Sequence, residues 1–155
     1  MHYVQLAITF AALAVPAVAQ WPQWGGPNGD FTTDGKGLAA AWPAAGRRQL
    51  WKRVLGEGYP GVAVQDGVLY TMYSSGRQET VTALDAATGK TKWEHTYPIG
   101  DGPRMDLSNG PGPHSTPLIL SDRVYTIGIR AIMYALDEKT GKPVLAEATL
   151  QRFSR

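Results

Sequence analysis

The residues best suited to binding chemistry lie in one stretch, from position 99 to position 113, that is rich in Gly and Pro. Asp101, Asp106 and Asn109 carry the carboxylate and amide oxygens that bind cations, and Arg104 adds a guanidinium. His114, directly after the stretch, adds an imidazole. Because loops on a rigid scaffold commonly carry function, this stretch is the best candidate for a binding loop. A solvated insertion is the alternative interpretation, and we prefer it.

Other chemistries have weaker support in the sequence. The three His residues, His2, His95 and His114, are scattered, which argues against a transition-metal site. Ser115 has no ordered His and Asp partners that would identify a nucleophilic triad. The segment 56–58, Gly-Glu-Gly, lacks the Lys-Ser/Thr pair and the following helix of a phosphate loop. We therefore predict no catalytic residue and no metal site, and the residues of any cofactor site stay unknown at this stage.

Composition describes the scaffold that would hold such a loop. The chain has 155 residues, a net charge of +2, 43% hydrophobic residues, 18 Gly, 11 Pro and no Cys. This composition is typical of a soluble, turn-rich globular protein. The lack of Cys excludes disulfides, and the scattered basic residues give no footprint for nucleic acid.

Residues 1–19 have the pattern of a signal peptide. An apolar run from Val4 to Val18 ends at Ala17-Val18-Ala19, a small-x-small cleavage pattern. The run is short for a membrane span and is interrupted by Pro16. We therefore expect export to the periplasm or the medium, with no stable membrane span after cleavage.

The part of the chain that would support this loop contains a sequence repeat. Ala-Leu-Asp, two variable residues and Thr-Gly-Lys begin at Ala83 and again at Ala135, an offset of 52 residues. Upstream, the segments 66–71 and 121–126 match at an offset of 55, so the first copy has three more residues between the matched segments. We place this difference in a longer connection at 74–79. Self-similarity at such a period indicates a repeat architecture.

Each copy consists of short β-type runs. β-branched and aromatic residues fill them, turn dipeptides such as Asp66-Gly67 separate them, and no helical periodicity appears after residue 20. The predicted strands are 61–65, 68–73, 79–84 and 91–97 in the first copy and 116–120, 123–129, 131–136 and 142–148 in the second.

The Asp-x-x-Thr-Gly-Lys segment predicts a hairpin turn. The Asp85 carboxylate can accept backbone N–H bonds, Thr88 can do so more weakly, and Gly89 can take the positive φ that closes a type I hairpin with a bulge. Lys90 then begins the strand that carries Trp93. A four-stranded sheet with such a Trp cannot bury both faces alone, but copies stacked radially can, and this favours a β-propeller.

The first copy, Ala83-x-Asp85-x-x-Thr88-Gly89-Lys90-x-x-Trp93, resembles the tryptophan-docking motif of pyrroloquinoline quinone (PQQ)-like propeller repeats. The second copy has Leu145 in place of the Trp but keeps the other positions, Ala135, Asp137, Thr140, Gly141 and Lys142. Segment 21–29 followed by 50–52 is also similar to the start of exported bacterial proteins with such repeats. The resemblance implies an all-β fold, a partial β-propeller of four-stranded antiparallel blades.

The predicted organisation has about two blades and an N-terminal strap. We assign a signal peptide (1–19), a strap (20–49), PQQ-like repeats (50–150) and a tail (151–155). The repeats comprise a strand from a closing blade (50–54), one blade at 61–97 and another at 115–149. Since propellers typically close with ~4–8 blades, we interpret the chain as an N-terminal fragment.

Two functions follow from the resemblance. The first is a non-catalytic scaffold that binds protein partners or a small ligand on the propeller face, with no cofactor in this chain. The second is a fragment of a PQQ-dependent dehydrogenase for alcohols or sugars, which uses PQQ and Ca²⁺. Antiparallel topology places 74–78 and 99–113 on one face, and in quinoproteins the corresponding face holds the cofactor. We prefer the scaffold.

Overall fold

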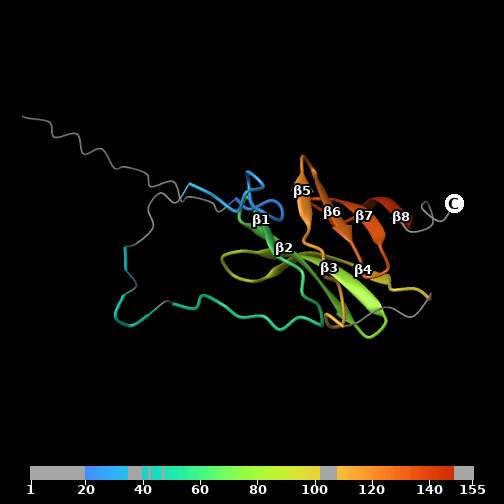
Figure 1. Cartoon of the computed structure of the whole chain (residues 1–155), viewed down its shortest axis with the longest axis horizontal. Coiled ribbons are helices and arrows are strands. Elements are labelled where there is room, and N and C mark those ends of the chain that lie inside the picture. Colours follow the sequence, from blue (N-terminus) through green and yellow to red (C-terminus); the bar gives the residue numbers. More distant parts are fainter. Residues whose placement is uncertain (1–19, 35–39, 42, 47, 102–107, 149–155) are drawn as a thin grey trace, which may run out of the picture.

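A computed structural model describes residues 20–34, 40–41, 43–46, 48–101 and 108–148. These residues form two four-stranded antiparallel sheets, each in the order of the sequence, and no helix (Figure 1). The predicted all-β architecture of four-stranded blades is confirmed. The predicted signal peptide and tail lie outside the described residues. The strands are β1 (Ala63–Gln65), β2 (Val68–Ser75), β3 (Gln78–Asp85) and β4 (Thr91–Pro98), then β5 (Leu118–Leu120), β6 (Arg123–Ile127), β7 (Ile132–Asp137) and β8 (Pro143–Ala148).

The extra residues of the first repeat lengthen its central strands. Pairing of β2 with β3 continues to Ser75↔Gln78, so only Gly76 and Arg77 form the turn. In the second repeat β6 ends at Ile127, and a four-residue turn follows because the Ala131 N–H donates to the Gly128 carbonyl at 2.8 Å. The longer connection expected at 74–79 is therefore wrong, since most of that segment is paired strand.

The core lies between the two sheets, which Figure 1 shows one above the other. Side chains alternate along each strand, so every second residue faces the partner sheet. The first sheet contributes Tyr70, Met72, Val81 and Trp93 to this layer, and the second contributes residues such as Val124. Burial of these side chains stabilises the packing of the two blades, by ~25 cal/mol per Å² of apolar surface.

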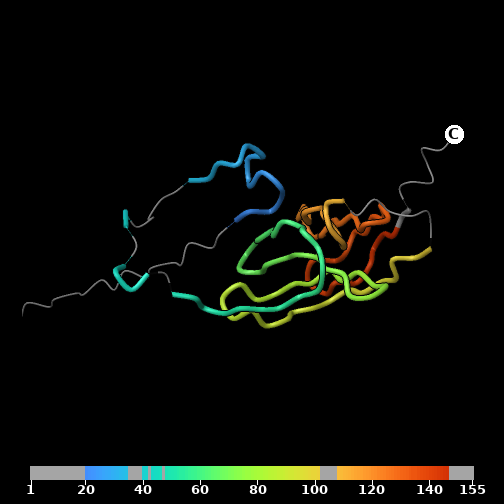
Figure 2. Tube along the Cα trace, turned by 60° about the horizontal axis from the view of Figure 1, so that its bottom comes forward, coloured from blue at the N-terminus to red at the C-terminus, as the bar shows by residue number. Residues whose placement is uncertain are grey.

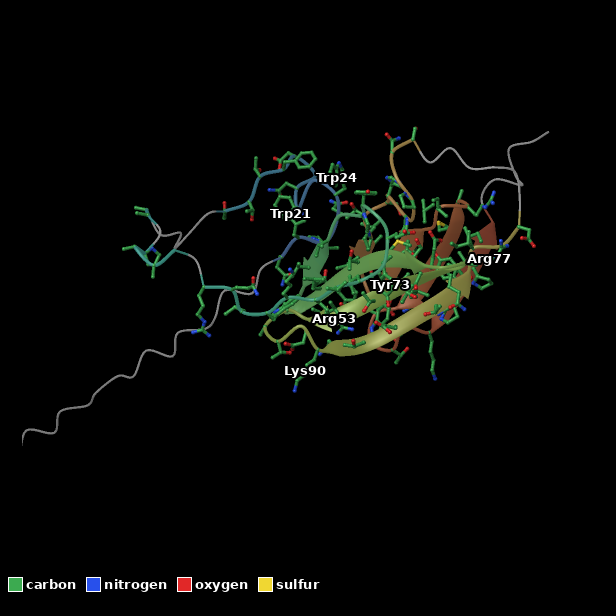
Figure 3. All side chains as sticks on the ribbon, turned by 90° about the horizontal axis from the view of Figure 1, so that it is seen from below. Trp21, Trp24, Arg53, Tyr73, Arg77 and Lys90 are labelled. Atoms are coloured by element: carbon green, nitrogen blue, oxygen red, sulfur yellow. The ribbon has the colours of Figure 1, made fainter. Side chains whose placement is uncertain are left out.

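The N-terminal strap ties the first strands of the two blades together. Trp21 and Val64 of β1 exchange two backbone hydrogen bonds, of 2.7 and 2.9 Å. The Pro22 carbonyl accepts the N–H of Ile119 in β5 at 2.8 Å. Figure 3 shows Trp21 and Trp24 on this strap, at the edge of the first sheet. One short segment therefore fixes the relative position of β1 and β5.

Residues 48–61 run alongside the first sheet (Figure 2). Glu57 and Ser74 form an isolated bridge with two backbone hydrogen bonds, and the Tyr59 N–H donates to the Pro113 carbonyl at 2.9 Å. Residues 50–54 pair with no strand of the described chain, so their assignment to a closing blade stays a prediction. No helix long and apolar enough to cross a membrane occurs in the described ranges.

Candidate interaction site

The side chain of Asp85 closes the first repeat turn. Its Oδ1 accepts the Thr88 N–H at 2.8 Å and the Thr88 hydroxyl at 2.7 Å. The Gly89 N–H donates to the Asp85 carbonyl at 2.8 Å, and Gly89 has a φ of +69°, which Gly adopts at no steric cost. The Asp85 N–H in turn donates to the Lys90 carbonyl at 2.8 Å. The turn is thus held by its own side chains.

The second repeat turn has the same geometry. Asp137 Oδ1 accepts the Thr140 N–H at 2.9 Å and the Thr140 hydroxyl at 2.7 Å. The Gly141 N–H donates to the Asp137 carbonyl at 2.8 Å with a φ of +68°, and the Asp137 N–H donates to the Lys142 carbonyl at 2.8 Å. The four residues that the two turns share, Asp, Thr, Gly and Lys, therefore form the same local structure twice.

These hydrogen bonds stabilise the ionised carboxylates. The Thr88 hydroxyl and then the Thr88 N–H lower the pKa of Asp85 from its ordinary value of 3.8. The Thr140 hydroxyl and N–H lower the pKa of Asp137 in the same way. Oδ1 of each carboxylate is therefore used within its own turn, and Oδ2 of Asp137 also forms an ion pair with Arg123 at 3.8 Å.

The motif Ala residues are buried between the neighbouring strands with which they pair. Ala83 is fully buried and pairs with Trp93 on one side and Tyr70 on the other. Ala135 is also buried and pairs with Tyr125 and Leu145. In both copies a register shift follows this Ala, at the next residue of the strand. It marks a β-bulge, which bends the hairpin before its turn.

Trp93 of the first blade binds the turn of the second blade. Its Nε1–H donates to the Glu138 carbonyl at 2.8 Å, and its side chain is 8% exposed. The indole covers Gly141 so closely that a Cβ there would lie 2.5 Å from Cε3 of the ring. Real Cβ contacts are not this short, so the site requires both the positive φ and the missing side chain of Gly141.

Trp51 makes the same contact with the first blade. Its Nε1–H donates to the Ala86 carbonyl at 2.9 Å, and a Cβ on Gly89 would lie 2.7 Å from its ring. Arg53 adds hydrogen bonds to the Gly89 carbonyl at 3.0 Å and to the Thr91 hydroxyl at 2.7 Å. Each described repeat turn is therefore covered by a Trp that comes from earlier in the chain.

The candidate binding loop is described only in part. Asp101 forms an ion pair with Arg77, which brings the end of β4 to the β2–β3 turn. Arg104 and Asp106 lie outside the described residues. Asn109 is exposed, and His114 Nε2 lies 3.2 Å from the Gly110 carbonyl. Within the described ranges no three His, Asp or Glu side chains are grouped to hold a metal ion.

A polar cluster in the seam between the sheets was not predicted from the sequence. Glu79 is 1% exposed, and its Oε1 accepts the N–H of Ile129, in the β6–β7 turn, at 2.9 Å. Tyr97 and Tyr134 lie with ring centroids 4.4 Å apart, and His95 packs 4.9 Å from Tyr134. The sequence held one signal for the burial of Glu79, the alternation of residues along β3, because Glu79 lies on the same face as Val81 and Ala83.

Burial controls the ionisation of this cluster. It raises the pKa of Tyr97, and the Glu79 carboxylate raises it further. Burial also raises the pKa of Tyr134 and lowers the pKa of His95 from its ordinary value of 6.5. The cluster therefore holds both phenols and the imidazole neutral near pH 7.

Comparison with known proteins extends these observations. The chain is similar to the 1-butanol dehydrogenase (quinone) of Thauera butanivorans, at 38% identity over 85 residues, which are 54% of this chain and 12% of that protein. Among solved structures it is similar to BamB from Moraxella catarrhalis, with 26% identity, a TM-score of 0.42 and coverage of 60% of this chain and 25% of that one.

A third relative is the quinohemoprotein alcohol dehydrogenase from Comamonas testosteroni, with 28% identity, a TM-score of 0.41 and coverage of 60% of this chain and 13% of that one. The chain thus spans a quarter or less of the length of each of these relatives. A PQQ-like repeat family model, described as "Outer membrane protein assembly factor BamB", matches residues 35–144. The match covers most of the chain, from the residues before the first blade to the start of β8 in the second, and the chain therefore belongs to this PQQ-like β-propeller repeat family.

Proposed function

We propose that this chain is part of an exported PQQ-like β-propeller that acts as a non-catalytic scaffold for binding other proteins. The main support for this proposal is that the polar groups of the repeat motif are bonded within the fold. The Asp85 and Asp137 carboxylates are bonded within their turns, and the indole N–H groups of Trp51 and Trp93 are bonded to the turns that they cover. These side chains build the interfaces between blades, so we assign the binding of other proteins to the loops between blades.

The family description supports a binding role, since it names an assembly factor for outer membrane proteins. Export agrees with the same description and with the signal-peptide pattern of residues 1–19. The propeller that we propose has further blades, because the outer face of the second sheet exposes Leu120, Ile127 and Leu145. An apolar face of this kind is normally covered by a neighbouring element.

A fragment of a quinone-dependent alcohol dehydrogenase is the second candidate function. The identity of 38% to a 1-butanol dehydrogenase (quinone) favours it. Such an enzyme uses PQQ to accept the electrons of the alcohol and Ca²⁺ to polarise the quinone. The described residues alone do not fit this pair of cofactors, because no acidic cluster for Ca²⁺ forms among them. Under this alternative the cofactor ligands belong to other parts of the protein.

The test uses the complete product of the gene that contains this sequence. The purified protein is incubated with PQQ and Ca²⁺, and oxidation of 1-butanol is followed by reduction of a redox dye. A scaffold gives no PQQ-dependent turnover. Turnover that requires both PQQ and 1-butanol would refute the scaffold and support the dehydrogenase.

Binding is tested on the same protein with a photo-crosslinking amino acid at Asn109, in the exposed candidate loop. The matched control carries it at Lys90, because Figure 3 shows Arg77 and Lys90 at opposite ends of the first sheet, and Asp101 next to the loop pairs with Arg77. A scaffold that uses this loop gives a defined protein adduct from position 109 and none from position 90. Equal labelling at both positions, or none, contradicts a binding role for the loop.

A further inference from the structure

The N-terminal strap carries two exposed aromatic side chains. Trp24 is 69% exposed and Phe31 is 60% exposed, so both rings present most of their surface to solvent. Their centroids lie 5.4 Å apart and their planes are inclined by 88°, so the two rings form perpendicular walls of an open corner. Figure 3 shows Trp24 on the strap, outside the two sheets. The corner therefore offers ring surface that the core between the sheets does not use.

The backbone of the strap holds this corner in place. At its base the strap is bonded to β1 and β5 through Trp21 and Pro22. The Phe31 N–H donates to the Gly25 carbonyl at 2.8 Å, which closes the loop that joins the two rings. After Phe31, the Thr32 N–H and hydroxyl donate to Oδ1 of the residue at position 30 at 2.9 and 2.7 Å. The corner is therefore formed before any ligand binds, which reduces the entropic cost of binding.

The backbone of Phe31 is strained. Its φ is +61°, in the left-handed region, where a bulky residue is a genuine outlier. Gly takes such a φ at no steric cost, and Gly occupies the strap positions 25, 26 and 29, which also have a positive φ. Because the Phe31 ring is mostly exposed, its packing gives little to offset the strain. Strained residues cluster at binding sites, so the ring at position 31 is better explained by binding than by folding.

The charge beside the corner is negative. The segment 20–34 contains Asp30 and Asp34 but no Lys, Arg or His. The Thr32 hydroxyl and then the Thr32 N–H lower the pKa of Asp30, so its exposed carboxylate is ionised near pH 7. Asp30 directly precedes Phe31, well within a Debye length of about 8 Å. The carboxylate and the faces of the two rings, which carry negative potential, therefore attract the same kind of ligand, a cation.

From the exposed corner, the strained Phe31 and the acidic surroundings, we infer that the strap binds an arginine side chain of a partner protein. The guanidinium lies over the faces of Trp24 and Phe31 and donates hydrogen bonds to the Asp30 carboxylate. Arginine fits better than lysine, because its planar group stacks on aromatic rings and is more weakly hydrated. A partner protein fits better than a free small cation, because small-molecule sites bury most of their ligand, whereas this corner is open.

This inference rests on the proposed scaffold function and names one site and one partner chemistry for it. A single exposed cation–π contact and a single exposed ion pair each contribute little, and the ion pair weakens with salt. Binding of one arginine segment should therefore be weak and salt-sensitive.

The test uses the complete product of the gene, isotope-labelled on its tryptophan indoles. The Nε1–H resonance of Trp24 is assigned from the variant Trp24→Phe, whose spectrum lacks it. Titration with the peptide acetyl-Gly-Arg-Gly-Arg-Gly-amide should shift this resonance to saturation. The same peptide with Gln in place of both Arg should leave it in place, because it carries no cation.

Two variants separate the charge from the ring. Asp30→Asn removes the charge but keeps an oxygen that can accept the Thr32 N–H, and it should bind the arginine peptide about two- to five-fold more weakly. The matched control is Asp101→Asn, the same change at an exposed residue that pairs with Arg77, and Figure 3 shows Arg77 well apart from Trp24. This control should bind as the wild type does.

Phe31→Gly removes one ring and its strain together. It should bind the arginine peptide about two- to five-fold more weakly. Its thermal melt should lie no lower than that of the wild type, because Gly takes the φ of position 31 at no steric cost. A loss of binding in this variant would therefore not result from unfolding.

Four results overturn the inference: no shift of the Trp24 resonance with the arginine peptide, an equal shift with the Gln peptide, an equal affinity of wild type and either Asp30→Asn or Phe31→Gly, or an equal loss in Asp30→Asn and Asp101→Asn. Choline that bound as tightly as the peptide would also overturn it, because the site would then take a free organic cation. Turnover in the quinone assay would refute the scaffold and leave these affinities unchanged, whereas failure of peptide binding without turnover would refute this site alone.

Discussion

Replacing Gly141 by Ala places one methyl group directly beneath the indole of Trp93. A Cβ there would lie 2.5 Å from Cε3 and 2.6 Å from Cδ2 of the ring, at a φ of +68°. The control is Gly67→Ala, because Gly67 has a φ of +75° and nothing within 4 Å of its added Cβ. The control should cost only the left-handed conformation, about 1–2 kcal/mol.

Gly141→Ala should cost more, because Trp93 must also leave its site. Complete loss of a buried Trp costs about 3–5 kcal/mol, so we expect a total of about 4–7 kcal/mol when the conformational cost of about 1–2 kcal/mol is added. The free energy of unfolding is measured from urea titrations followed by far-UV circular dichroism. In a Trp93→Ala background the cost of Gly141→Ala should fall to that of the control. Equal costs for Gly141→Ala and Gly67→Ala in the wild-type background would refute the docking geometry.

Three further perturbations test the turns and the seam. Asp85 has a lowered pKa in the folded chain, so its contribution to stability is present above the unfolded pKa and is lost as pH falls through the folded pKa. In Asp85→Asn, the free energy of unfolding from urea titrations should depend less on pH between about pH 5 and pH 2. Burial lowers the pKa of His95 in the folded chain, so the unfolded chain binds a proton first as the pH falls below about 6.5. The free energy of unfolding should therefore be highest above that pH and decrease below it. His95→Phe should remove this pH dependence in thermal melts. Glu79→Gln keeps an acceptor for the Ile129 N–H, whereas Glu79→Ala leaves that N–H unpaired and should cost about 1–3 kcal/mol more in urea titrations; equal stability of the two variants contradicts a structural role for that bond.

The features that could be predicted from the sequence are those whose causes are local. The hydrogen bonds of Asp85 involve residues no more than five positions away, so the turn is determined by its own sequence, and the same turn forms at Asp137. The alternation of β-branched and aromatic residues likewise fixes the sheets. Strand lengths were less accessible, because Ser75 and Gln78 extend a hairpin that the sequence pattern alone does not distinguish from a longer loop.

The features that could not be predicted depend on contacts between distant residues. Glu79 and Ile129 are fifty positions apart, and the sequence around either residue does not predict the hydrogen bond between them. The contact between Trp93 and Gly141 is similar, since it forms only when the second blade packs against the first.

The two blades also show what a neighbouring blade does to a sheet. Trp93 and Leu145 occupy equivalent places, each paired with the motif Ala on the adjacent strand. Trp93 is 8% exposed because the second blade covers it, whereas Leu145 is 44% exposed. The local pairing is the same in both sheets, so the difference in burial arises from the element beyond the sheet. The first blade is therefore completed by the second, whose turn supplies the Glu138 carbonyl and the side-chain-free Gly141 against which Trp93 packs.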